Sequence, residues 1–224
     1  MLPEMSSENL SKSGSNQTVK KRAYCSSCQR PEKACICQFT CDVQNSINVL
    51  VLQHPSEVKQ TKGTVSLLAQ SLDKIDILVG EDFSTSMELA QFIEQNSPCY
   101  VLHPNEQATS LTEVSNGQIN GQSIKGLIII DGTWKKAYRM YQLTKPLQQL
   151  PSLALPDNIE CFYHIRKTKK QQALSSFEAC VHALALLEQD QAKYQQMIDN
   201  FIRFNQFQLS FTPSHHQLNG KSEQ

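Results

Sequence analysis

The sequence predicts an α/β fold, in which a mostly parallel sheet of about five or more strands carries helices on both faces. Short apolar runs rich in β-branched residues recur along the chain, and segments with helical apolar spacing separate them. A length of 224 residues, with 39% apolar and 19% charged side chains, suffices for one globular domain. Four closely spaced cysteines near the N-terminus add a small module, a predicted four-cysteine zinc knuckle.

The expected strands are the short apolar runs, and the clearest is 127–130 (LIII), because an unbroken apolar run is typical of a strand buried on both faces. In chain order they are residues 47–52, 75–79, 99–102, 127–130 and 159–165. Each expected helix has apolar residues three and four positions apart. In chain order the helices are residues 64–72, 86–95, 133–141, 175–189 and 191–208. The polar stretch 105–123 contains two Asn-Gly pairs and is expected to be a turn-rich loop.

Domain limits follow from the composition. Residues 1–22 and 212–224 are polar without an apolar pattern and are expected to be disordered tails. The zinc knuckle is assigned to residues 23–42 and the α/β domain to residues 43–211. No apolar run is long enough to cross a membrane, and no signal peptide is visible, so we expect a cytoplasmic protein without a membrane partner.

The charges sum to zero, with 21 basic and 21 acidic residues, but they are segregated along the chain. The balance is +3 over residues 1–37, −7 over 38–131, +6 over 132–170 and −2 over 171–224. The two basic blocks either converge on a surface that binds nucleic-acid phosphates or lie on solvated faces that never meet. The bases of the second block are Lys135, Lys136, Arg139, Lys145, Arg166, Lys167, Lys169 and Lys170.

The metal prediction rests on the spacing C-x2-C-x6-C-x-C. Four thiolates at such short spacings can close a tetrahedral site around zinc, and a segment this short has no core of its own. An iron–sulfur cluster and free thiols are the alternatives, and Cys41 is a candidate substitute ligand. The expected ligands are Cys25, Cys28, Cys35 and Cys37. The cysteines in apolar surroundings, expected to be buried packing residues, are Cys99, Cys161 and Cys180.

Polar residues follow each expected strand, where ligands of parallel sheets gather. His54 follows the first strand, His103 the third and Asp131 the fourth. Either histidine has a structural alternative, because each precedes a proline and marks an extended exit from its strand. Asp131 is either a base within a site or the cap of the helix that begins near Thr133.

Several motifs, taken in order, resemble the DTW-domain family over roughly residues 24–190. They are the cysteine pattern, His54-Pro55-Ser56-Glu57, Asp131-Gly132-Thr133-Trp134 followed by Ala137 and Met140, Tyr163-x-x-Arg166, and Leu174-Ser175-Ser176-x-Glu178-Ala179. The departures are Gly63-Thr64, where many members have Asn-Thr, and Ser175-Ser176, where many have Ser-Thr. The resemblance implies a fold related to the knotted SPOUT methyltransferases and a catalytic role for residues 43–211.

The resemblance also implies an activity. Members of the family are tRNA-uridine aminocarboxypropyltransferases, which move the 3-amino-3-carboxypropyl group of S-adenosylmethionine onto a uridine base nitrogen. Uridine N3 is a poor nucleophile until it loses its proton, so the enzyme needs a base and accurate positioning. Asp131 would be that base or would orient the substrate. Trp134, the only tryptophan, would stack on the uracil or adenine ring or, alternatively, anchor its helix in the core.

The remaining site residues follow from the same reasoning. Arg166 could bind the methionine carboxylate and Glu57 or Glu178 its ammonium group, although Glu178 lies three residues after Ser175 and a capping box is the competing interpretation. Ala137 and Met140 are expected to pack in the core. The expected cofactor-binding residues are His54, Glu57, Leu102, His103, Pro104, Asp131, Gly132, Thr133, Arg166, Leu174, Ser175, Ser176 and Glu178. The expected RNA-binding residues are Lys135, Lys136, Arg139, Lys167, Lys169 and Lys170.

The predicted partners are therefore tRNA and S-adenosylmethionine, with no DNA, and zinc has a structural role. Two alternatives stay open at this level. One is a methyltransferase of related fold that uses the same cofactor, and the other is a non-catalytic zinc module that binds RNA. The by-product separates the enzymes, because a methyltransferase releases S-adenosylhomocysteine and an aminocarboxypropyltransferase releases methylthioadenosine.

Overall fold

A computed structural model describes residues 23–58, 60, 63–114, 118–119, 121–156, 159 and 174–211. The chain divides into a small N-terminal unit that ends at Cys35 and a larger unit that begins at Ile36. The small unit contains the 3-10 helix η1 (Glu32–Ala34). The two predicted disordered tails, residues 1–22 and 212–224, lie outside the described residues.

The larger unit is built on a parallel sheet of six strands in the order β2-β1-β7-β3-β8-β4. This confirms the predicted α/β class. In chain order the strands are β1 (Asn48–Gln53), β2 (Ile75–Val79), β3 (Cys99–Leu102), β4 (Thr109–Ser110), β7 (Gly126–Asp131) and β8 (Ser152–Ala154). The knot that the family resemblance implies stays a prediction.

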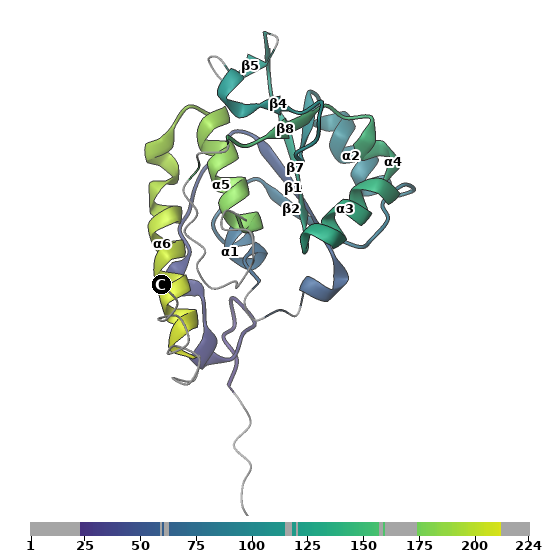
Figure 1. The fold of residues 1–224 in the computed structure, drawn as a ribbon. Coiled ribbons are helices and arrows are strands. Elements are labelled where there is room, and N and C mark those ends of the chain that lie inside the picture. Colours follow the sequence, from purple (N-terminus) through teal and green to yellow (C-terminus); the bar gives the residue numbers. More distant parts are fainter. Residues whose placement is uncertain are drawn as a thin grey trace, which may run out of the picture. The chain divides into compact units, whose positions relative to one another are not determined.

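Helices cover both faces of this sheet, as predicted. Figure 1 shows α1, α5 and α6 on one side of the strands and α2, α3 and α4 on the other. Their bounds are α1 (Val65–Ala69), α2 (Met87–Gln95), α3 (Trp134–Leu143), α4 (Lys145–Gln148), α5 (Ser176–Leu187) and α6 (Gln191–Ser210). Short 3-10 turns complete the unit: η2 (Cys37–Phe39), η3 (Pro55–Glu57) and η4 (Leu111–Glu113). Within the described residues, no helix combines the length and the apolar character needed to cross a membrane.

Two parts of the sequence prediction differ from the structure. The stretch 105–123 is not only loop, because it holds β4, η4 and a small hairpin of β5 (Gln118–Ile119) and β6 (Gln122–Ser123). Strand β8 was not predicted, since three residues are too few for any alternation of apolar and polar side chains to appear. The expected strand over 159–165 falls almost entirely outside the described residues, and Ile159 itself is not in a strand.

The central strand β7 positions the turn and the helix α3 that follow it in the chain. It lies between β1 and β3, and Leu50, Leu52, Val101 and Ile128 from these three strands pack with Met140 of α3 in one apolar cluster. Each such buried side chain stabilises the fold by about 1.5–3 kcal/mol. Because Met140 is part of that cluster, the first turn of α3 is held directly beyond the carboxyl end of β7.

Candidate active site

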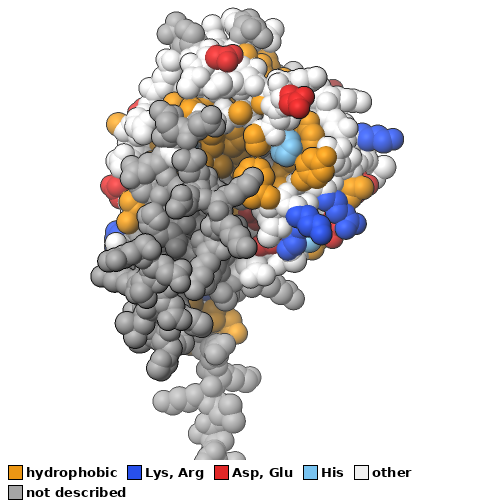
Figure 2. Space-filling model, in the orientation of Figure 1, with side chains coloured by type: hydrophobic (Ala, Val, Ile, Leu, Met, Phe, Trp, Pro, Cys, Tyr) orange, Lys and Arg blue, Asp and Glu red, His pale blue; other side chains and the backbone are white. Residues whose placement is uncertain are grey.

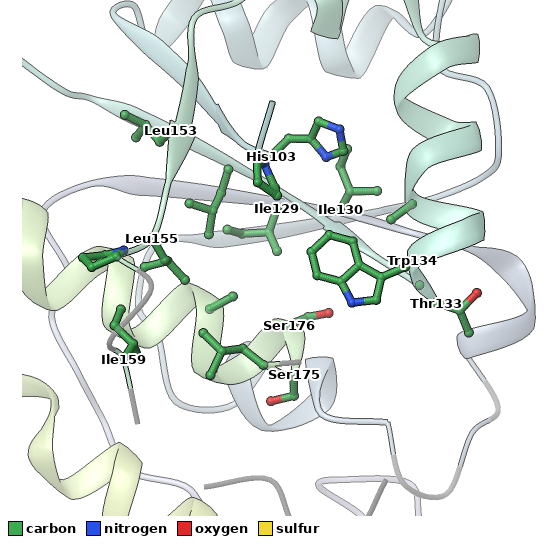
Figure 3. A pocket seen from close by; sticks show the side chains of 17 residues that line it. His103, Ile129, Ile130, Thr133, Trp134, Leu153, Leu155, Ile159, Ser175 and Ser176 are labelled. Atoms are coloured by element: carbon green, nitrogen blue, oxygen red, sulfur yellow. The ribbon is translucent and has the colours of Figure 1, made fainter. Parts of the chain in front are cut away.

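A cavity of about 430 Å³ lies at the carboxyl edge of the sheet (Figure 3). The ends of β3, β7 and β8 and the first turns of α3 and α5 form its walls. Predicted site residues from three separate segments of the chain meet here. Their residues in the wall are Leu102, His103, Pro104, Gly132, Thr133, Trp134, Leu174, Ser175 and Ser176. That a cofactor binds among them stays a prediction.

Sequence reasoning missed part of this wall. Strand β8 and the residues after it contribute apolar side chains that no motif contains, and their only signal was the short apolar run between Pro151 and Pro156. The wall residues that were not predicted to belong to the site are Ile129, Ile130, Ala137, Leu153, Leu155, Pro156, Ile159 and Ala179. The cavity is therefore more apolar than the motifs alone suggested, which suits the flat face of a heterocyclic base.

His103 is the one histidine among the wall residues. Its ring stacks on Tyr141 of α3 with the centroids 4.2 Å apart and the planes 24° from parallel. Burial lowers the pKa of His103 below its usual value, because the charged imidazolium loses hydration. At neutral pH the cavity is therefore lined by an uncharged imidazole, which can accept or donate a hydrogen bond without adding a positive charge.

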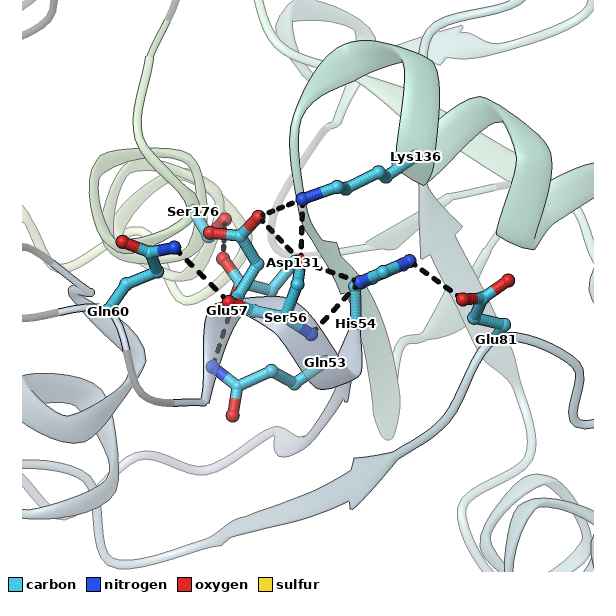
Figure 4. Close-up of polar contacts among 9 residues, drawn as sticks. All are labelled: Gln53, His54, Ser56, Glu57, Gln60, Glu81, Asp131, Lys136 and Ser176. Atoms are coloured by element: carbon cyan, nitrogen blue, oxygen red, sulfur yellow. Dashed lines mark hydrogen bonds and ion pairs between the residues drawn. The ribbon is translucent and has the colours of Figure 1, made fainter.

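Asp131 is held by two side chains from distant parts of the chain (Figure 4). Gln53 Nε2 donates to Asp131 Oδ2 at 2.9 Å, and Ser176 Oγ donates to Asp131 Oδ1 at 2.5 Å. The parallel register places Gln53 directly beside Asp131 on the neighbouring strand. Thr133 is the N-cap of α3, and its side chain makes no capping hydrogen bond. The alternative that Asp131 caps this helix is therefore wrong, because its carboxylate oxygens face Gln53 and Ser176.

The start of α5 is fixed by a capping box, as the alternative interpretation of Glu178 proposed. Ser175 Oγ accepts from the backbone N–H of Glu178 at 3.2 Å, and the backbone N–H of Ser175 donates to Glu178 Oε2 at 2.8 Å. Glu178 is only 2% exposed and is not part of the cavity wall. Its carboxylate orients the first turn of α5, which presents Ser175 and Ser176 to the cavity.

The turn after β1 is tied to α3. Lys136 Nζ donates to Glu57 Oε1 at 2.9 Å and to Ser56 Oγ at 2.6 Å, while His54 Nε2 lies 3.2 Å from Glu81 Oε1. His54 and Glu57, both predicted to bind the cofactor, are therefore beside the cavity and not in its wall. Lys136, predicted to bind RNA, is engaged within the protein.

The outward face of α3 is aromatic and basic. Trp134 is 56% exposed and Tyr138 is 59% exposed, while Ala137 and Met140 are buried as predicted. The alternative that Trp134 anchors the core is wrong, since the opposite face of the helix does that. Lys135 is exposed, and Arg139 is exposed with only a 3.5 Å contact to Glu81. Figure 2 shows hydrophobic side chains around a hollow that holds a histidine, with a group of Lys and Arg side chains beside it.

Other predicted residues lie outside the described part of the chain. They are Arg166, Lys167, Lys169 and Lys170, together with Cys161.

The four predicted metal ligands come together. The Sγ atoms of Cys25, Cys28, Cys35 and Cys37 all lie within 4.8 Å of one another, and the Cys28 and Cys35 sulfurs are 3.8 Å apart. A tetrahedral zinc site with metal–sulfur bonds of about 2.3 Å requires sulfur–sulfur separations of about 3.8 Å, so the donor set fits this metal. Cys41 is not part of the cluster.

Cys99 and Cys180 are buried, as predicted, and burial raises the pKa of each thiol to about 12. Both therefore remain protonated at neutral pH and serve as packing residues.

Comparison with known proteins gives a consistent result. The sequence model of the DTW domain matches residues 22–209. A protein of Macaca fascicularis named tRNA-uridine aminocarboxypropyltransferase 2 is 30% identical over 86% of this chain, and its counterpart of the same name in Mus musculus is 28% identical over 85%. One of the same name in Drosophila melanogaster is 26% identical over 88% of the chain and 79% of its own length.

The chain spans 66% of the length of the macaque relative and 65% of the mouse relative. No solved structure matches the chain. The family match covers both the cysteine cluster and the parallel sheet with its cavity, from residue 22 to residue 209. This chain belongs to the DTW-domain family.

Proposed function

We propose that the protein is a tRNA-uridine aminocarboxypropyltransferase that transfers the 3-amino-3-carboxypropyl group of S-adenosylmethionine to N3 of a tRNA uridine. The observation that carries the proposal is the cavity at the carboxyl edge, whose wall reaches Asp131 through Ser176. The names of the relatives supply the substrate class. The reaction requires an apolar place for a base and a group that takes a proton, and we assign both roles to this edge of the sheet.

S-adenosylmethionine brings an activated electrophile, the γ-carbon next to its sulfonium. The apolar wall around Leu102, Pro104 and Leu153 suits its adenine ring. The first turn of α5 beside Ser176 suits its carboxylate, because the positive end of the helix dipole favours an anion there. Arg166 and the ammonium partner Glu57 remain proposals for the methionine end, while the carboxylate of Glu178 is used in the capping box.

The proposed reaction can be tested directly by its products. The full chain incubated with tRNA and S-adenosylmethionine should yield the aminocarboxypropyl nucleoside by mass spectrometry, and methylthioadenosine in equal amount. Formation of S-adenosylhomocysteine and a methylated nucleoside would instead identify a methyltransferase. Binding of tRNA without any binding of the cofactor in calorimetry would identify a non-catalytic RNA-binding module.

We assign the tRNA interaction to the outward face of α3, with Lys135 and Arg139 on phosphates and Trp134 and Tyr138 beside bases. Replacing both basic residues with Gln should weaken tRNA binding. The plot of the logarithm of the binding constant against the logarithm of the salt concentration should also become less steep, by about 0.7–0.9 for each phosphate that is no longer neutralised. Filter binding between roughly 50 and 200 mM salt measures this slope, because the affinity for phosphates falls steeply over that range.

The matched control is Lys74→Gln. Lys74 is exposed and immediately precedes β2, at the edge of the sheet opposite the cavity. An equal change of slope per charge removed in this control would mean that the effect is one of net charge and not of the α3 face. Salt-insensitive binding by the unmodified chain would remove the electrostatic assignment altogether.

A further inference from the structure

Asp131 does not itself line the cavity, but one of its hydrogen-bond partners does. It is 9% exposed and is not one of the residues that form the cavity wall. Each of its carboxylate oxygens already accepts a hydrogen bond, one from Gln53 and one from Ser176. Of these two donors only Ser176 is in the wall. The hydroxyl of Ser176 is therefore the group that connects the cavity to the carboxylate.

The direction of this hydrogen bond decides what Ser176 can offer to a ligand. Asp131 is acceptor-only when ionised, so the Ser176 hydroxyl hydrogen points at Oδ1 over 2.5 Å. A serine hydroxyl has one hydrogen and two lone pairs, so Oγ is left to act as an acceptor. Ser176 Oγ therefore suits a ligand group that donates a hydrogen bond. Uracil N3–H is such a donor, and it carries the proton that the reaction has to remove.

We propose that Ser176 is a catalytic residue that relays the uridine N3 proton to Asp131, an inference that rests on the proposed function. N3 gives its proton to Ser176 Oγ while the Ser176 hydroxyl proton passes to Asp131 Oδ1. The nitrogen lone pair forms the N3–C bond with the γ-carbon of S-adenosylmethionine. The C–S bond breaks, and its electron pair returns to sulfur. The products are the modified uridine, neutral methylthioadenosine and a protonated Asp131.

The surroundings keep the two groups in line. Ser176 is the first residue of α5, and the Ser175–Glu178 capping box fixes that turn. Gln53 holds the far oxygen of Asp131 from the adjacent position of β1. An amide donor orients the carboxylate without bringing a positive charge next to it.

The test compares Ser176→Ala with Ser176→Thr, which retains a hydroxyl. Ser210→Ala, at the exposed end of α6, is the matched control. With both substrates saturating, single-turnover transfer should fall about 10²-fold in Ser176→Ala, recover largely in Ser176→Thr and be unchanged in Ser210→Ala. The family resemblance assigns Ser176 to the cofactor, whereas the relay places it on the uridine, so calorimetry should find S-adenosylmethionine bound equally by all four chains. A thermal melt verifies that each variant is folded.

A proton inventory gives a second readout that does not depend on how threonine fits. In mixtures of H2O and D2O, the single-turnover rate of the unmodified chain should curve with deuterium content, as two protons in flight require. A linear plot for the unmodified chain overturns the relay. So does a Ser176→Ala variant whose rate is unchanged, or whose only defect is weaker cofactor binding.

The two proposals fail in different ways. If the unmodified chain forms no aminocarboxypropyl nucleoside, the proposed function is contradicted and the relay falls with it. If the unmodified chain and Ser176→Ala form the nucleoside at equal rates, the relay alone is contradicted.

Discussion

Asp131→Asn should reduce aminocarboxypropyl transfer about 10³-fold while the protein remains folded, because removing a positioned base typically lowers the rate by about 10²–10⁴-fold. Asparagine has nearly the same shape, and its carbonyl can still accept from Gln53 Nε2, which donates at 2.9 Å in the native chain. Its NH2 group would then face Ser176 Oγ and could only donate. The amide therefore cannot take a proton, and the Ser176 hydroxyl loses its acceptor.

The measurement is the initial rate of nucleoside formation by mass spectrometry, with tRNA binding and the melting temperature measured on the same samples. Asp76→Asn is the matched control, since Asp76 is an exposed carboxylate in β2. Full activity in Asp131→Asn would show that Asp131 has a structural role only. It would leave the family membership of the chain intact.

The second large effect concerns the cysteine cluster. We expect one tightly bound zinc per chain and expect that Cys28→Ala, or prolonged chelation, abolishes it. The four sulfurs lie within 4.8 Å of one another. Without a bound cation, four thiols this close together would have nothing to hold them in that arrangement. Structural zinc contributes about 10–16 kcal/mol in zinc-finger peptides, as much as the whole stability of a typical domain. Residues 23–37 should therefore lose their fold when the metal is removed.

Elemental analysis measures the metal, and amide hydrogen exchange over residues 23–37 measures the local fold. Cys41→Ala is the control, because Cys41 lies outside the cluster, and it should keep the full zinc content. Iron and sulfide found in the purified protein would instead identify the site as an iron–sulfur cluster. Protection unchanged by chelation would show that the segment folds without metal.

Much of the fold could be predicted because its signals are local. Strand β7 is an unbroken apolar run, and a sheet buried on both faces requires that pattern. Ser86 stands immediately before α2 and accepts from Leu89 N–H, so this helix start was visible in the sequence. Strand β8 left no such signal, since it is three residues long and depends on pairing with β3 and β4.

The exposed face of α3 shows how far residue spacing alone can go. Helical spacing separated Ala137 and Met140 from the outward residues, but it could not tell whether Trp134 lay in the core or in solvent. Whether a tryptophan on a helix is buried or exposed depends on which other parts of the protein pack against that side of the helix. Here the cluster that includes Met140 fills the inner face, and Trp134 is left 56% exposed in the cavity wall.

The sequence by itself determined the parallel α/β class, the cysteine cluster and the family, because each depends on residues close together in the chain. Only the tertiary structure decided how Asp131 is used. Its partners are 45 and 78 residues away, and neither spacing nor composition could place Ser176 and Gln53 at its two oxygens. The alignment of β1 with β7 and the docking of α5 created that arrangement, since sheet register and helix packing bring together side chains that local sequence cannot relate.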